Sequence, residues 1–346
     1  MHLDSPLTAR LGSAKTKERK RELIDGFKNM IREAVEIGAG AIIIAGDLFD
    51  SDKTGLRTID TIVGAIERAA QITFFYLSGN HEKNILLSSG ISLPKNLKIF
   101  EEGWTYFDIN GISVVGRSET SPTMFSTLKL DPNRRNIVVL HGELRDKSDE
   151  NGKIGIKELS DLPIDYLALG HYHSYSETIT DSGCYAVYCG TPEGRGFDET
   201  GDKGYVILDV NDKGVFHRFQ RRAKRRLHII EVDITGTKRE VEIENRVSEK
   251  LSSIPFCDMV RVCLTGEHEL GLSPNTEMLE LRFASDYYYF EIKDITKLRI
   301  CVEDYKNDLS LKGEFIRLVL SKDELTDEEK SAIIECGIRA LAKEEI

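Results

Sequence analysis

The chain has 346 residues, of which 30% are charged and 40% hydrophobic, as is usual for a soluble globular protein. Its formal net charge of −11 argues against a protein that binds nucleic acid through its overall field. No apolar run is long enough to span a bilayer. The six cysteines show no C-x-x-C spacing, which favours free thiols in a reducing cytoplasm over a zinc ribbon.

The predicted elements begin with a charged amphipathic helix over 15–37 and a second helix over 56–70. Apolar runs predict strands on either side of the second helix and a strand-rich stretch after it. The predicted strands are 41–45, 73–77, 97–100, 105–109, 112–115, 137–140, 166–169, 175–180, 184–188, 204–210 and 214–219. Strand–helix alternation followed by a β-rich half predicts an α/β fold.

Polar clusters follow four of these strands at the point where each strand ends. They supply, in chain order, Asp47 and Asp50; Asn80, His81 and Glu82; His141; and His171 and His173. In an open α/β sheet this edge is where active sites assemble. Imidazole, carboxylate and amide ligands suit divalent ions such as Mn²⁺, Fe²⁺ or Zn²⁺. The combination predicts a two-metal hydrolase site.

In order, the clusters read GDLFD, GNHE, a strand-end His and GHYH. On these motifs, residues 1–220 resemble the calcineurin-like metallophosphoesterase superfamily. The resemblance implies a four-layer β-sandwich flanked by helices.

The opening Met1-His2-Leu3-Asp4-Ser5-Pro6 resembles the tail of the family's first motif, D-x-H. The Asp of that motif, and the strand that carries it, would lie before Met1. Either the true start lies upstream, which we favour, or this is a natural variant that lacks one ligand. For the chain as written, we expect an impaired metal site and a weakened sheet centre.

Composition predicts three parts, over 1–222, 223–305 and a helical tail over 306–346. Strands at 227–234, 258–265 and 286–295 and helices at 239–251 and 275–283 indicate that the second part is an α+β module. The resemblance implies that the first part is the metallophosphoesterase (nuclease) domain and the second a capping domain. A capping-box sequence at 326–329 predicts a last amphipathic helix over 328–343. The apolar stripe of the tail suits either packing on its own domain or docking in a partner.

The most basic run of the chain, 218–226, lies at the first predicted domain boundary. It is either a solvated linker or a strip that contacts phosphates of DNA. The candidate DNA-binding residues are Arg221, Arg222, Lys224, Arg225 and Arg226.

Three features resemble the DNA repair nucleases of the SbcD type: the H-L-D-S-P opening, the module after the basic run and the L-K-G-E-F-I-R-L-V tail. The resemblance implies an Mn²⁺-dependent DNA nuclease that acts in double-strand-break repair. It would be an exonuclease that can also act as a single-strand endonuclease. It also implies a cytoplasmic homodimer that works with an SbcC-like, SMC-type ATPase, with no membrane association.

The same resemblance implies the role of each residue. Asp47 would bridge two metal ions; His2 and His173 would complete one site, and Asn80, His141 and His171 the other. His81 would protonate or stabilise the leaving 3′-oxygen. Asp50 and Glu82 would orient ligand histidines or shape the loop.

Two alternatives stay open. The chain could be a phosphatase or phosphodiesterase for small substrates, since fold and metal site alone do not separate these from nucleases. It could also be a catalytically impaired scaffold subunit of the ATPase complex. Retention of His81 argues against the scaffold, which has no use for a leaving-group acid.

Overall fold

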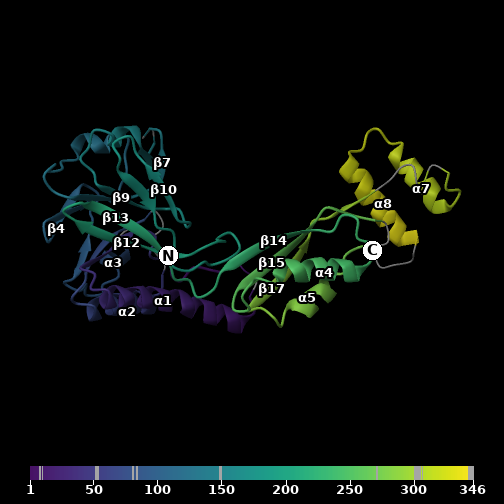
Figure 1. Ribbon diagram of the computed structural model, residues 1–346, viewed down its shortest axis with the longest axis horizontal. Helices are drawn as coiled ribbons and strands as arrows, with labels where there is room; N and C mark the ends of the chain where they lie inside the picture. Colours follow the sequence, from purple (N-terminus) through teal and green to yellow (C-terminus); the bar gives the residue numbers. More distant parts are fainter. Residues whose placement is uncertain are drawn as a thin grey trace. The chain divides into compact units, whose positions relative to one another are not determined.

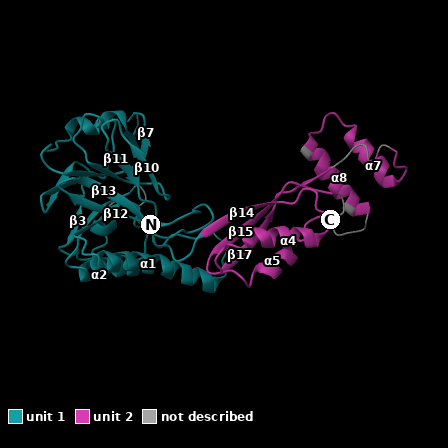
Figure 2. Cartoon of the chain, viewed as in Figure 1, with its two compact units in different colours: residues 1–226 teal, residues 227–346 magenta. Residues whose placement is uncertain are grey.

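The computed structural model describes residues 1–7, 9, 11–50, 54–79, 82, 85–147, 150–269, 272–299, 305 and 307–341. The chain divides into two units, Met1–Arg226 and Leu227–Ile346 (Figure 2). Each unit has its own hydrophobic core. The observed boundary follows residue 226, and the three-part division at 222 and 305 stays a prediction.

A small parallel sheet forms the first layer of strands in unit 1. It has the order β1-β2-β3, with β1 Ala41–Ala45, β2 Thr73–Leu77 and β3 Leu97–Ile99. The apolar runs AIIIA and TFFYL lack the alternation of a half-exposed strand, because both faces of this sheet are covered. Helices α1 (Ser13–Glu36) and α2 (Leu56–Arg68) pack on one face (Figure 1). The short helix α3 (Ile85–Ser88) adds to the same core.

A six-stranded sheet forms the second layer, in the order β10-β11-β9-β6-β5-β4. The inner four strands run parallel, and the two edge strands run antiparallel to their neighbours. The bounds are β4 Thr105–Ile109, β5 Ile112–Gly116, β6 Asn136–His141, β9 Tyr166–Gly170, β10 Ser176–Ile179 and β11 Tyr185–Tyr188.

The two sheets pack face to face. Phe75 and Leu77 of β2 lie in one buried cluster with Val114 of β5 and Val139 of β6. This apolar layer makes unit 1 a β-sandwich with helices, which confirms the predicted fold class.

The outer face of the six-stranded sheet is covered differently from that of the first sheet. Among the described residues, it packs on two 3₁₀ turns, η1 (Met124–Thr127) and η2 (Lys157–Leu159), and on loops. A two-stranded sheet of β7 (Glu143–Arg145) and β8 (Lys153–Gly155) lies between these turns in sequence. The hairpin of β12 (Gly204–Asn211) and β13 (Gly214–Arg221) adds apolar side chains beside Tyr166 and Val187.

Unit 2 begins with a three-stranded parallel sheet in the order β14-β15-β17. Helices α4 (Glu240–Leu251) and α5 (Thr276–Phe283) pack on it through one apolar core. The strands are β14 Leu227–Asp233, β15 Met259–Thr265 and β17 Tyr289–Asp294. The strands and helices predicted for this stretch are present, and their alternation around a parallel sheet is an α/β rather than an α+β arrangement.

The last elements of unit 2 are helices α7 (Leu311–Leu320) and α8 (Asp327–Leu341), which share a small core with Leu298. Leu298 belongs to β18 (Lys297–Leu298), which pairs with β16 (Glu267–His268). The predicted capping box is present: Glu329 N–H donates to Thr326 Oγ1 at 3.2 Å, and Thr326 N–H donates to Glu329 Oε2 at 2.8 Å. None of the helices that the structure describes is long and apolar enough to cross a bilayer.

A buried charge cluster joins α1 to the segment that follows β13. Glu22 is 4% exposed and accepts hydrogen bonds from Arg225 at 2.9 and 3.1 Å. It also forms an ion pair with Lys224 at 2.7 Å. Arg19, 1% exposed, also pairs with Glu22 and donates to the carbonyl oxygen of Gly194 at 2.7 Å. Burial by itself raises the pKa of Glu22, but these three cations outweigh it and lower the pKa to about 2. The cluster therefore ties α1 to the end of unit 1 electrostatically.

We expect Glu22→Gln to lower the free energy of unfolding by about 3 kcal/mol near neutral pH, because it leaves buried cations without their carboxylate. The folded-state pKa lies below the ordinary value of 4.5, so the contribution is present above pH 4.5 and is lost as the pH falls towards 2. Denaturant unfolding at several pH values measures this difference. The control is Asp25→Asn, which breaks an exposed pair with Arg21 on the same helix and should cost under about 1 kcal/mol. An equal effect of the two changes, or no pH dependence, would contradict the assignment.

Candidate metal centre

Glycines let the ends of four strands meet at one edge of the sandwich. A Cβ on Gly46 or Gly170 would lie closer than 3.0 Å to Nδ1 of His141, and a Cβ on Gly79 would lie as close to the carboxylate of Asp47. Gly170 also faces the carbonyl oxygen of Ala45 with no room for a side chain. Gly46, Gly79 and Gly170 therefore leave room for Asp47 and His141 to approach each other at this edge.

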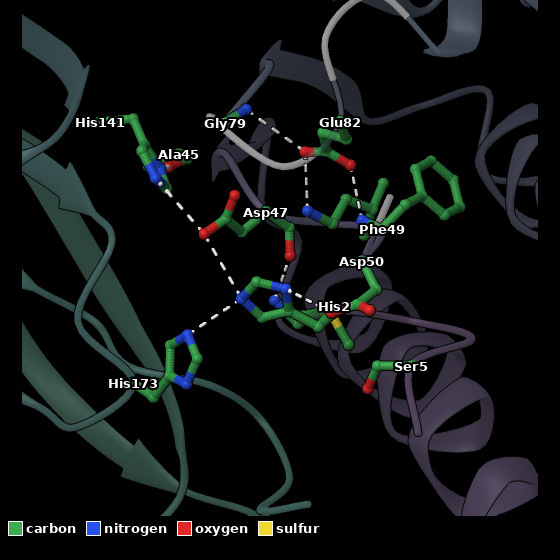
Figure 3. A network of polar contacts seen from close by, with 12 residues as sticks. His2, Ser5, Ala45, Asp47, Phe49, Asp50, Gly79, Glu82, His141 and His173 are labelled. Carbon is green, nitrogen blue, oxygen red and sulfur yellow. Dashed lines mark hydrogen bonds and ion pairs between the residues drawn. The ribbon is translucent and has the colours of Figure 1, made fainter. Parts of the chain in front are cut away.

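Three imidazoles surround the buried carboxylate of Asp47 (Figure 3). Its Oδ2 lies 3.4 Å from Nε2 of His2 and 3.3 Å from Nε2 of His141. Nε2 of His173 lies 3.0 Å from Nε2 of His2. The ligand atoms of His2, Asp47 and His173 all lie within 4.8 Å of one another.

The outer ring nitrogens fix the tautomers of two of these histidines. Nδ1 of His141 lies 2.9 Å from the carbonyl oxygen of Ala45, and Nδ1 of His173 lies 2.7 Å from Oε1 of Glu199. Because a carbonyl and a carboxylate only accept hydrogen bonds, each Nδ1 carries the proton. Each Nε2 therefore presents a lone pair to the centre, which is the form of histidine that binds metal ions.

The donor set fits a divalent cation. Among the residues that the structure describes, Oδ1 of Asp47 is buried and accepts no hydrogen bond. A buried anion facing imidazole lone pairs is stabilised by a bound cation, and His/Asp sites of this kind suit Mn²⁺, Fe²⁺ or Zn²⁺.

The backbone at the centre is strained. His2, Asp47 and His171 have φ values of 50°, 52° and 113°, in a region that non-glycine residues seldom adopt. Such strain is held in place by the surrounding structure and is concentrated at functional sites.

His171 lies at the margin of the group. Its ring meets that of His141 edge-on, with centroids 5.6 Å apart, and its side chain is exposed. Loss of part of its hydration shell to neighbouring protein atoms, and the nearby His141, lower the pKa of His171, which favours the neutral, metal-binding form. Asn80 and His81 lie outside the described residues, so their roles stay predictions.

Glu82 holds the loop that carries Asp47. It is fully buried and accepts hydrogen bonds from the backbone N–H groups of Leu48 at 2.8 Å and Phe49 at 2.5 Å. Burial raises the pKa of Glu82 to about 7. Asp50 lies 3.2 Å from Nδ1 of His2. The roles of Glu82 in shaping the loop and of Asp50 in orienting a histidine stay predictions.

Two residues that contact His173, Glu199 and Arg195, lie outside the four predicted motifs. Glu199 is 2% exposed, and Arg195 donates to it from its backbone and its side chain. Burial by itself raises the pKa of Glu199, but bonds from His173 and Arg195 lower it to about 2. In sequence, the only signal is that this polar run follows an apolar strand, as the four clusters do. The fold adds that β11 runs parallel to β9, so the run reaches the same edge as the clusters.

The five candidate DNA-binding residues lie in ion pairs within unit 1. Arg221 and Arg226 pair with Asp202, Arg222 pairs with Glu33, and Lys224 and Arg225 pair with Glu22. These pairs give the basic run a structural role, and phosphate contact by any of the five stays a prediction.

Comparison with known proteins matches part of this sequence to a family. Residues 20–175 match the family described as calcineurin-like phosphoesterase. The uncharacterized metallophosphoesterase YhaO of Bacillus subtilis is 26% identical over 286 residues, which cover 77% of this chain and 67% of YhaO.

Several further relatives are named DNA double-strand break repair protein Mre11, and two of them illustrate the match. The protein of Methanosarcina acetivorans is 25% identical over 256 residues, 68% of this chain and 41% of its own length. That of Haloferax volcanii is 24% identical over 243 residues, 67% of this chain and 54% of its own length. The chain thus matches less than two thirds of either Mre11 protein.

We expect Gly170→Ala to lower the free energy of unfolding by about 2–3 kcal/mol, because its methyl group would overlap the carbonyl oxygen of Ala45. The matched control is Gly103→Ala, whose Cβ would meet no atom within 4 Å and whose φ is not positive. Denaturant unfolding compares the two. Equal stability of both variants would show that the strand ends are less tightly packed than described.

Proposed function

We propose that this chain, which belongs to the calcineurin-like phosphoesterase family, is a two-metal nuclease that hydrolyses DNA phosphodiester bonds. The observation that carries the hydrolase assignment is the set of imidazoles around the buried carboxylate of Asp47. The choice of DNA rests on relatives whose names assign them to double-strand break repair.

His2, Asp47 and His173 would hold one divalent ion, most favourably Mn²⁺. Asp47, His141 and His171, with Asn80, would hold the second. Bound ions at such a site supply Lewis acidity to the phosphoryl group and make a bound water acidic.

The residues of the chain prepare the site for this chemistry. The bonds from His141 to Ala45 and from His173 to Glu199 keep both Nε2 lone pairs directed toward Asp47 and His2. Glu82 fixes the Asp47 loop through two backbone N–H groups. The metal-binding side chains therefore need little rearrangement when metal ions and substrate bind. His81 would donate a proton to the leaving 3′-oxygen.

The partners belong to the same proposal. DNA is the substrate, and an SbcC-like, SMC-type ATPase and a second copy of this chain are the protein partners. The resemblance in sequence supports these protein partners.

The first test is metal removal. We expect cleavage of linear single- and double-stranded DNA in Mn²⁺, loss of cleavage with a chelator, and recovery when Mn²⁺ is restored. Asp47→Asn should reduce cleavage by about 100-fold or more, because the bridging carboxylate loses its charge. Arg134→Gln, which breaks an exposed pair with Asp108, should leave cleavage unchanged. A second form carries an aspartate directly before Met1, so that Asp, Met1 and His2 complete the D-x-H pattern. It is assayed in parallel with the chain as given.

Turnover of a small phosphodiester without cleavage of DNA by either form would favour the small-substrate enzyme. Tight Mn²⁺ binding with no hydrolysis of any phosphodiester would favour the scaffold.

We expect His81→Ala to reduce DNA cleavage by about 10²–10⁴-fold, the usual contribution of a general acid. Mn²⁺ affinity should be unchanged, because His81 is not among the proposed ligands. Calorimetric Mn²⁺ titration and a cleavage assay measure the two effects separately. A parallel loss of metal binding would make His81 a ligand instead, and unchanged cleavage would remove it from the mechanism.

A further inference from the structure

We propose that Arg195 is a positioning residue that orients two metal-ligand histidines, His2 and His173, each through an intervening carboxylate. The inference rests on the two-metal assignment above. It concerns a residue of the stretch after β11, which belongs to none of the four strand-end motifs.

The first arm of this network runs through Glu199 to His173. Arg195 contacts Oε1 of Glu199 with Nε at 2.8 Å and Nη2 at 2.6 Å, and its backbone N–H donates to Oε2 at 2.9 Å. Held by three donors, Glu199 has little freedom to rotate and presents Oε1 to Nδ1 of His173 at 2.7 Å. A carboxylate in this place fixes the ring and raises the basicity of the opposite nitrogen.

Nη2 of Arg195 also lies 3.4 Å from Nδ1 of His173. The guanidinium can only donate, so it favours an unprotonated Nδ1, whereas the carboxylate of Glu199 favours a protonated Nδ1. The carboxylate is nearer by 0.7 Å (3.4 minus 2.7), which keeps the proton on Nδ1 and the lone pair on Nε2.

The second arm runs through Asp50 to His2. Nη1 of Arg195 lies 3.5 Å from Oδ1 of Asp50, and the same oxygen lies 3.2 Å from Nδ1 of His2. Nη1 also donates to Oγ of Ser5 at 3.1 Å, which ties the first residues of the chain to the same guanidinium. The side chains of Arg195 and Asp50 are 13% and 32% exposed, so this arm is more open to water than the first, in which Glu199 is 2% exposed.

The shape of the guanidinium explains why one residue can serve both arms. Its Nε and Nη2 edge faces Glu199, while Nη1 points to Asp50 and Ser5. A lysine ammonium is a single charge without this fixed fork and could not hold both carboxylates in one geometry. Because the network joins His2 to His173, a displacement of Arg195 should disturb both ligands together.

A second cation from the same stretch, Lys203, contacts the backbone of His173. Lys203 is 1% exposed, and its Nζ donates to the carbonyl oxygen of His173 at 2.7 Å. It holds the backbone of His173, whereas Arg195 acts on the ring.

The test compares the parent chain with Arg195→Gln, Arg195→Lys and Glu199→Gln. Spectra of the metal-free, ¹⁵N-histidine-labelled chain report which nitrogen of each ring is protonated, and calorimetry reports Mn²⁺ affinity. Arg195→Gln should shift the signals of both His2 and His173 and weaken Mn²⁺ binding by about 10–100-fold. Glu199→Gln should shift His173 more than His2, whose ring is affected only through its contact with His173, and Arg195→Lys should recover only part of the affinity.

The matched control is Arg135→Gln, which removes an arginine–carboxylate pair with Asp165 at the opposite end of β6. It should leave both histidine signals and Mn²⁺ affinity unchanged. A purely structural role for Arg195 would lower stability without moving the ring signals or the affinity of the folded chain, and that result would overturn the proposal. So would a shift confined to one histidine.

Neither readout depends on DNA cleavage, so failures of the two proposals can be told apart. Arg195-dependent Mn²⁺ binding in a chain that cuts no DNA would overturn the nuclease assignment alone. If the parent bound no Mn²⁺, the two-metal assignment would fail, and the metal-free spectra would still decide whether Arg195 orients both rings.

Discussion

The constraint on which the site depends is the close approach of strand ends that lack side chains. Gly46, Gly79 and Gly170 leave room for atoms that belong to other strands, and a Cβ on any of them would overlap a carbonyl oxygen, a ring nitrogen or a carboxylate. This contact brings Asp47 within reach of His141 and places β9 against β1. The apolar layer between the sheets then holds the strands at this separation. The same glycine contacts and the same apolar layer therefore determine both the sandwich packing and the positions of the candidate metal ligands.

Much of the fold could be predicted from the sequence, because its elements obey local rules. Continuous apolar runs predicted β1 and β2, amphipathic spacing predicted α1, and the Thr326–Glu329 capping box predicted the start of α8. The candidate ligands were equally visible, since each directly follows an apolar strand. These signals are short in range and need no knowledge of tertiary contacts.

The remaining features depend on partners distant in sequence. Glu199 acts on His173 only because β11 lies beside β9, and the run after β11 carries no motif that predicts the bond. The basic run suggested contact with phosphates, yet Arg222 pairs with Glu33, which lies 189 residues earlier in the chain. Charge composition shows that cations are present. Only the fold shows which carboxylates neutralise them.

The sequence separation between His2 and His173 has a consequence for the lifetime of the folded chain. Their Nε2 atoms meet across 171 residues, so an ion bound between them would close a loop spanning most of unit 1, much as a crosslink does. A ligand that binds only the folded state stabilises it by about 2.7 kcal/mol when its concentration is 100 times the dissociation constant. Metal supply would therefore control how often unit 1 opens to proteases, in addition to whether it can hydrolyse a phosphodiester.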